Sequence, residues 1–174
     1  WLDELQTSGA VLDAPALRER HHAMLERLNA EAGRIEASFD FFLRKRAPVS
    51  GLASLLDYRG RWIAQTCNAE TVVWAEVGVP VKSLCPCSKE ISDYGAHNQR
   101  ALVTLRVELL QPIEWHELVR FAEDEASSEI WPMLKRTDEK WVTERAYDNP
   151  KFVEDLVRDI ALRLRSDERI AAYV

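Results

Sequence analysis

Alternation of apolar with polar residues is the feature of this sequence that most restricts its fold. In residues 37–43, and again in 99–110, apolar side chains occupy every second position, which is the period of a β-strand and not of a helix. Residues 55–66 and 71–83 are rich in aromatic and β-branched side chains, and Asn68-Ala69-Glu70 between them suits a hairpin connection. These four segments are therefore expected to be strands.

Three other segments repeat apolar residues near every 3.6 positions, which is typical of amphipathic helices. They are residues 14–36, with Asp13 as the expected N-cap, residues 114–130, and residues 151–165, which Asn149-Pro150 would start with a cap and a first-turn proline. The polar composition of residues 131–148 predicts a loop. Residues 170–174 are expected to begin a further strand. Strands followed by two helices and a strand predict an α+β fold with an antiparallel sheet.

Composition restricts the class of protein and its partners. The chain has 174 residues, of which 47% are hydrophobic, so it can bury a real core. Its net charge of -6 argues against nucleic acid as the main partner, because neutralising a phosphate backbone requires a basic face. No apolar run approaches the roughly 18 residues of a membrane span, and the N-terminus lacks the layout of a signal peptide. We expect no nucleic acid and no membrane partner, and a cytoplasmic location.

Residues 84–100 hold two of the three cysteines and one of the four histidines within a turn-forming stretch. Thiolate and imidazole are preferred ligands of Zn²⁺ and similar ions, and Cys85, Cys87 and His97 are close enough in sequence to converge on one ion. The paired Cys-x-x-Cys or His spacing of structural zinc is missing, which favours a three-ligand catalytic site with an open position. The alternatives are buried cysteines and a turn histidine. Cys67 has no such setting and is interpreted as structural.

The same loop also resembles a known signature. Residues 81–100, Val-Lys-Ser-Leu-Cys-Pro-Cys-Ser-Lys-Glu-Ile-Ser-Asp-Tyr-Gly-Ala-His-Asn-Gln-Arg, are similar to that of the type IB GTP cyclohydrolases, and the similarity continues through 47–51, 54–58, 123–127 and 135–169. It implies the tunnelling fold, with antiparallel sheets, helices packed on one face, and two related modules at about 1–96 and 97–174. It also implies homotetramers with interfacial active sites, and family segments before Trp1 and after Val174.

The resemblance assigns roles to individual residues. Cys85, His97 and Glu139 would bind a divalent metal ion, whereas spacing alone cannot select Glu139 from 29 acidic residues. Donors of mixed softness accept Mn²⁺ or Fe²⁺ as well as Zn²⁺, so the identity of the metal stays open. Glu154 would anchor guanine by accepting hydrogen bonds from its ring N–H and amino group, although its position between Val153 and Leu156 also suits a solvated helix face.

The implied activity is the metal-dependent hydrolysis of GTP to 7,8-dihydroneopterin triphosphate and formate, the first step of tetrahydrofolate biosynthesis. A general acid or base is expected in a His-x-His element of the family's C-terminal segment. The candidate cations for the triphosphate are Lys89, Arg100, Lys135, Arg136 and Arg145. Three alternatives stay open: a cyclic phosphate product, nitrile reductase chemistry with Cys85 or Cys87 as nucleophile and a nicotinamide cofactor, and a non-enzymatic metal-binding module.

Overall fold

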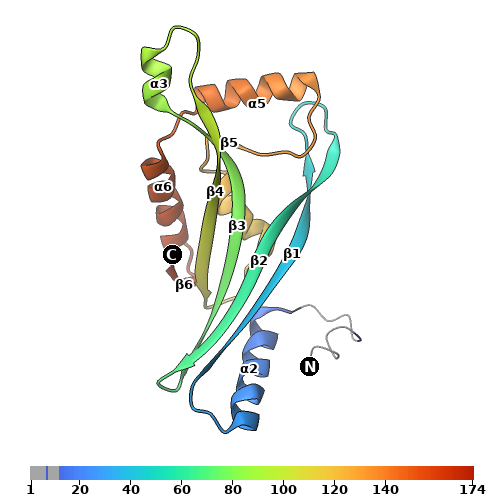
Figure 1. Cartoon of the computed structure of the whole chain (residues 1–174), viewed down its shortest axis with the longest axis vertical. Helices are drawn as coiled ribbons and strands as arrows, with labels where there is room; N and C mark the ends of the chain where they lie inside the picture. Colours follow the sequence, from blue (N-terminus) through green and yellow to red (C-terminus); the bar gives the residue numbers. More distant parts are fainter. Residues whose placement is uncertain (1–6, 8–11) are drawn as a thin grey trace.

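The computed structural model describes Thr7 and residues 12–174, which form an antiparallel sheet with helices packed against it (Figure 1). In chain order the elements are α2 (Ala14–Leu28), β1 (Gly33–Arg46), β2 (Ala53–Cys67), β3 (Glu70–Leu84), α3 (Pro86–Ile91), β4 (Asn98–Leu109), α4 (Trp115–Glu123), β5 (Ser128–Glu129), α5 (Arg136–Asp148), α6 (Val153–Arg165) and β6 (Ile170–Tyr173).

The sheet has six strands in the order β1-β2-β3-β4-β6, and the short β5 also pairs with β3. Every pairing is antiparallel. Asn68 and Ala69 both have positive φ angles, and they connect Cys67 to Glu70 as a two-residue turn. The hairpin predicted at this place is therefore confirmed, and its turn has the backbone conformation that matches the twist of the two strands.

The core lies between one face of the sheet and helices α2, α4 and α6. The alternating valines of β3, among them Val77 and Val79, are fully buried, and so is Leu17 of α2. Leu118 of α4 and Leu156 of α6 belong to the same cluster. Burial of alternate strand residues against amphipathic helices is the expected way to bury one face of such a sheet. The prediction of an α+β fold with an antiparallel sheet is confirmed.

The first helix is shorter than predicted. Asp13 caps it as expected, since its carboxylate accepts from the backbone N–H of Ala16 over 2.8 Å. The helix ends at Leu28 because Asn29 adopts a left-handed conformation with φ 48°, a common way to end a helix. Residues 33–36, which the helical period had included, belong to β1. There Ile35 begins the strand alternation and packs on the core.

Residues 124–148 also differ from the prediction. The helix expected over 114–130 ends at Glu123, and Ser128 and Glu129 pair with β3 instead. The polar loop expected over 131–148 contains helix α5. This helix buries only Asp138, Val142 and Ala146, one residue per turn, so the wide apolar stripe that identifies an amphipathic helix is missing.

The start of the last helix was predicted two residues too early. Phe152 is its N-cap, while Asn149 is instead the C-cap of α5. Leu156, Ile160 and Leu164 are buried as the period predicted. The final strand was correctly predicted and pairs with β4.

The predicted division into modules at 1–96 and 97–174 stays a prediction; residues 1–6 and 8–11 of the first module lie outside the described residues. β3 and β4, from the two proposed modules, pair over residues 74–84 and 98–108. Among residues 7 and 12–174, no helix has the length and apolar character needed to span a bilayer.

Candidate functional site

Cys85 and His97 meet where β3 ends and β4 begins. The backbone N–H of Cys85 donates to the carbonyl oxygen of His97 over 3.1 Å, one step beyond the last ladder pair, Leu84 and Asn98. Ser88 reinforces the contact, since its hydroxyl donates to the Cys85 carbonyl over 3.1 Å and accepts from the backbone N–H of His97 over 3.0 Å. Two residues that are twelve positions apart in the sequence are thus held side by side by their backbones.

The two cysteines of this loop lie outside the core. Cys85 is half-buried just before α3, and Cys87 in its first turn is exposed. A hydrogen bond from the backbone N–H of Ser88 lowers the pKa of the Cys85 thiol, and partial burial opposes this effect. The thiolate is the form of cysteine that binds metals and attacks electrophiles, so Cys85 is chemically suited to either role. Cys67 is exposed at the end of β2.

Glu154 is brought to the same end of the sheet by the segment between α5 and α6. The backbone N–H of Lys151 donates over 3.0 Å to the carbonyl of Leu84, the residue before Cys85. Glu154 follows three residues later, exposed in the first turn of α6. Its carboxylate makes no hydrogen bond or ion pair with any residue that the structure describes. It is therefore available to a ligand.

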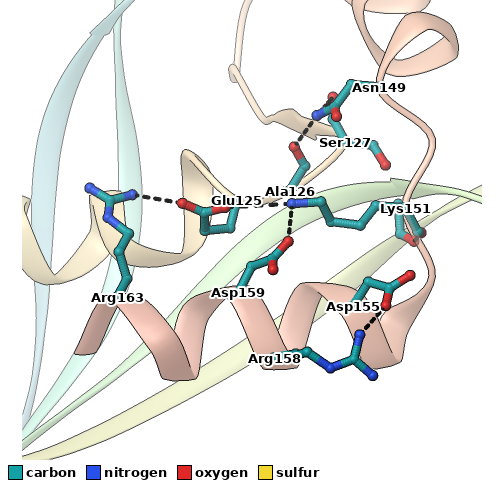
Figure 2. Close-up of polar contacts among 10 residues, drawn as sticks. Glu125, Ala126, Ser127, Asn149, Lys151, Asp155, Arg158, Asp159 and Arg163 are labelled. Atoms are coloured by element: carbon teal, nitrogen blue, oxygen red, sulfur yellow. Dashed lines mark hydrogen bonds and ion pairs between the residues drawn. The ribbon is translucent and has the colours of Figure 1, made fainter. Parts of the chain in front are cut away.

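Polar contacts fix this connection against the end of α4 (Figure 2). The Asn149 amide donates to the carbonyl of Ala126 over 3.0 Å. The Lys151 ammonium pairs with Asp159 of α6 over 2.8 Å and with Glu125 over 3.5 Å. Because these contacts join the segment that follows α4, helix α6 and the segment before α6, they determine where the first turn of α6 lies.

Glu139, the third predicted ligand, stands exposed in the first turn of α5. Its neighbour Asp138 is fully buried and accepts from the backbone N–H groups of Val49, Ser50 and Lys135 at 2.8–2.9 Å and from the Ser50 hydroxyl at 2.7 Å. Burial opposes ionisation of Asp138, but these hydrogen bonds hold its pKa below the usual range. Asp138 thus ties the start of α5 to the turn between β1 and β2.

The donor set fits a divalent metal ion only in part. Cys85 and His97 supply one soft and one borderline donor at one place, which suits zinc, iron or manganese. Over residues 7 and 12–174, however, no three His, Cys, Asp or Glu side chains are gathered closely enough to hold an ion. Within the described residues, Glu139 is therefore not gathered with the other two.

A cavity of about 380 Å³ lies at the same end of the sheet, between β3, the start of β4, β5 and α5; Asn98, the residue after His97, belongs to its lining, while Cys85 and His97 do not. Its lining includes two cations, Lys82 and Arg100, the amides of Asn98 and Gln99, and the indole of Trp131. It combines hydrogen-bond donors, positive charge and an aromatic surface, which are the groups that bind nucleotides.

Of the five cations that the sequence suggested for a triphosphate, Arg100 alone lines this cavity. Lys89 donates to the carbonyl of Tyr147 and lies 4.2 Å from the centroid of its ring. Arg145 lies 5.5 Å from the centroid of the Trp141 ring. The other two stand at the start of α5 and are exposed.

Sequence reasoning missed two residues that shape this region. Lys82 could have been noticed as the one charged residue in the second half of β3. Ser127 is buried and accepts from the backbone N–H of Leu84 over 3.1 Å. No sequence signal distinguishes Ser127 from other serines.

Comparisons with known proteins place the chain in a family. A family model described as type I GTP cyclohydrolase FolE2 matches residues 2–174. The chain is 58% identical to GTP cyclohydrolase FolE2 of Methylibium petroleiphilum, over 99% of the chain and 68% of that protein. It is 59% identical to the proteins of the same name from Paraburkholderia xenovorans and Burkholderia thailandensis, over 98% of the chain and 63% of each. The chain thus spans about two thirds of the length of these relatives.

Proposed function

The chain belongs to the type I GTP cyclohydrolase FolE2 family, and from this premise we propose that it hydrolyses GTP to 7,8-dihydroneopterin triphosphate and formate, the first step of tetrahydrofolate biosynthesis. The observation that carries the proposal is the meeting of three segments at one end of the sheet. The Cys85–His97 pair, the first turn of α6 and the cavity beside β4 all adjoin the last residues of β3.

In the proposed reaction, water attacks C8 of guanine and opens the imidazole ring, and a second hydrolysis releases formate. Rearrangement of the ribose and ring closure, which releases one water, then give 7,8-dihydroneopterin triphosphate. Glu154 accepts hydrogen bonds from the ring N–H and the amino group of guanine, which a carboxylate can do with both oxygens at once. A base without these donors would leave the acceptors unpaired, and this disfavours its binding.

The cofactor of the proposed enzyme is a divalent ion, Zn²⁺, Mn²⁺ or Fe²⁺, for which Cys85 and His97 are the proposed ligands together with Glu139. Support comes from the backbone contact between the first two residues and from the lowered thiol pKa of Cys85. When bound, such an ion supplies Lewis acidity for the hydrolysis. A lowered thiol pKa would also suit a covalent nucleophile, but membership of the family favours the ligand role.

The proposed assembly is a homotetramer with active sites at subunit interfaces. Apolar side chains next to Glu154 support it, because Phe152, Val153 and Val157 are 40%, 51% and 60% exposed. Exposed apolar groups that flank a polar site are typical of a surface that a partner covers. We place the enzyme in the cytoplasm, where GTP is available and thiols stay reduced.

The test combines metal analysis with an assay of GTP turnover on the full-length protein. Cys85→Ala and His97→Ala are expected to lose both bound metal and formation of dihydroneopterin triphosphate, while the matched control Cys67→Ala keeps both. Circular dichroism would show that each variant is folded. Undiminished metal stoichiometry in either variant would remove that residue from the ligand set, and a wild-type protein that released no formate from GTP would refute the function.

A further inference from the structure

The loop that begins at Cys85 and ends at His97 is held only weakly by packing. Helix α3, which lies within it, buries none of its residues, and the side chains of Ile91 and Tyr94 are largely or fully exposed. A segment with so few buried apolar contacts has little local stability of its own. The hydrogen bond between Cys85 and His97 joins the two ends of the loop, but it does not fix residues 86–96 between them.

Lys89 connects this loop to another element. Its ammonium donates to the backbone carbonyl of Tyr147, in the last turn of α5, and lies 4.2 Å from the centroid of the Tyr147 ring. In the described part of the chain, no other residue of 86–96 makes a hydrogen bond or an ion pair with a residue outside 85–97. Helix α3 accordingly lies beside the end of α5 (Figure 1). A single side chain therefore tethers the loop.

The tether is favourable without any ligand. The last carbonyl groups of a helix have no partner within the helix, and the helix dipole places partial negative charge there, so a cation at this end is stabilised. The face of an aromatic ring also attracts an ammonium group. Because Lys89 is only half-buried, its charge keeps part of its hydration. The positive charge of Lys89 is thus satisfied within the fold, which argues against its use as a phosphate cation.

The end of α5 leads directly into the segment that carries Glu154. Glu154 follows Tyr147 by seven residues. Between them, the backbone N–H of Lys151 donates to the carbonyl of Leu84, the last residue of β3. The same segment is held against the residues after α4 by the contacts that Figure 2 shows. The loop is thus fixed to one connection at two points, through the backbone of Leu84 and through the side chain of Lys89.

We propose that Lys89 is a positioning residue, which holds the loop of Cys85 and His97 in register with Glu154 and does not bind the triphosphate. The assignment rests on the proposed function. If Glu154 holds the guanine, C8 of the ring is correctly placed only while the loop lies at a fixed distance from the first turn of α6. A displacement of about 1 Å between reacting groups can cost on the order of 100-fold in rate.

The experiment compares Lys89→Met with Lys140→Met, which removes an equal charge from an exposed position of α5. Steady-state kinetics on the metal-loaded full-length protein should show kcat lowered roughly tenfold or more in Lys89→Met, with KM for GTP changed by less than about threefold. Lys89→Arg, which keeps a donor for the carbonyl, should recover part of kcat. Tyr147→Phe keeps both the carbonyl and the ring, so this variant and the control should match the wild type.

Hydrogen–deuterium exchange tests the tether without turnover. The backbone amides of residues 86–97 should exchange faster in Lys89→Met than in the wild type or in Lys140→Met, while those in the core of β3 and β4 keep their rates. Unchanged exchange in residues 86–97 would overturn the tether whatever the kinetics. Faster exchange with an unchanged kcat would overturn the positioning role.

Two further outcomes separate this proposal from its neighbours. A raised KM with unchanged kcat, together with loss of inorganic triphosphate binding in a calorimetric titration, would assign Lys89 to the substrate and overturn the proposal. Faster exchange in Lys89→Met, with a wild type that released no formate from GTP, would refute the function and leave the tether standing.

Discussion

Replacing Lys45 by methionine should destabilise the fold strongly, because this lysine neutralises a buried carboxylate. The Lys45 ammonium lies 2.6 Å from Glu123, and both side chains are more than nine-tenths buried. The Tyr58 hydroxyl donates to the same Glu123 oxygen over 2.9 Å. Lys45 also pairs with Glu129, which is partly exposed. Without the lysine, Glu123 would remain a buried charge with one neutral donor.

The size of the effect follows from this geometry. Removing one partner of a buried ion pair costs about 3–5 kcal/mol. The Tyr58 hydrogen bond remains and Glu129 can reach water, so the lower end, about 3 kcal/mol, is expected. For a chain of this length, that loss corresponds to a Tm lower by about 6–12 °C.

The loss should also depend on pH in a defined direction. Burial raises the pKa of Glu123 above its ordinary value, and Lys45 partly offsets the increase. A carboxyl whose pKa is raised by folding holds its proton more tightly in the folded state, so stability falls as the pH rises above the ordinary carboxyl pKa toward the folded one. Without Lys45 the pKa of Glu123 in the folded state is higher still, so in Lys45→Met the pH range over which stability falls extends further upward. The variant should therefore be closer to the wild type at pH 5 than at pH 8.

Thermal unfolding followed by circular dichroism at pH 5 and pH 8 would measure both effects. In the double variant Lys45→Met/Glu123→Gln the buried charge is gone, so it should be more stable at pH 8 than Lys45→Met alone. Lys140→Met is the matched control, since it breaks an exposed pair with Glu144 that contributes less than about 1 kcal/mol. The reasoning would be refuted if Lys45→Met lowered the Tm no more than this control, or equally at the two pH values.

Three further predictions concern the site and the sheet. Glu154→Gln should keep its metal but lose turnover, with a cost on the order of 2 kcal/mol or more for the lost charged acceptor; near-normal activity would make Glu154 a solvated helix residue. Protein stripped by chelator and restored anaerobically should form dihydroneopterin triphosphate with Zn²⁺, Mn²⁺ or Fe²⁺, and activity with Zn²⁺ alone would argue against Glu139 as a ligand. Gly60→Ala should lower the Tm, since the added Cβ would lie 2.9 Å from the Phe39 ring and overpacking costs about 1–3 kcal/mol. Gly78→Ala is the control, because the nearest contact of its added Cβ is at 3.5 Å. An equal Tm in the two variants would contradict the clash.

Most of the sheet was predictable because its signal is local. Alternation in β1 and β4 and the β-rich composition of β2 and β3 located all four long strands. Ile35 was placed in a helix because it fits both the helical period from Leu28 and the strand alternation. Only the left-handed conformation of Asn29 separates these interpretations, and the sequence does not display a backbone angle. Helix α5 was missed because its buried stripe is one residue wide and begins with Asp138.

The candidate site was predictable only where its parts are close in sequence. The pairing of Cys85 with His97 lies within one loop, so its chemistry could be inferred from residue types. The approach of α6 depends on a hydrogen bond between the backbones of Leu84 and Lys151, sixty-seven positions apart, and no spacing rule indicates it. The family resemblance pointed to Glu154 and Glu139. It indicated neither Lys82 nor the hydrogen bonds by which the Ser88 hydroxyl joins the backbones of Cys85 and His97.

The contrast between the buried and the exposed polar groups determines which experiments can separate chemistry from folding. Glu123 and Asp138 are buried and hydrogen-bonded on several sides, so their loss changes the fold whatever else they do. Cys85, His97 and Glu154 are half-buried or exposed, and backbone contacts of their own segments hold the first two in place. Side-chain truncation at these positions leaves those backbone contacts intact. Loss of activity in such variants, with an unchanged Tm, would therefore report the chemistry of the site and not the stability of the sheet.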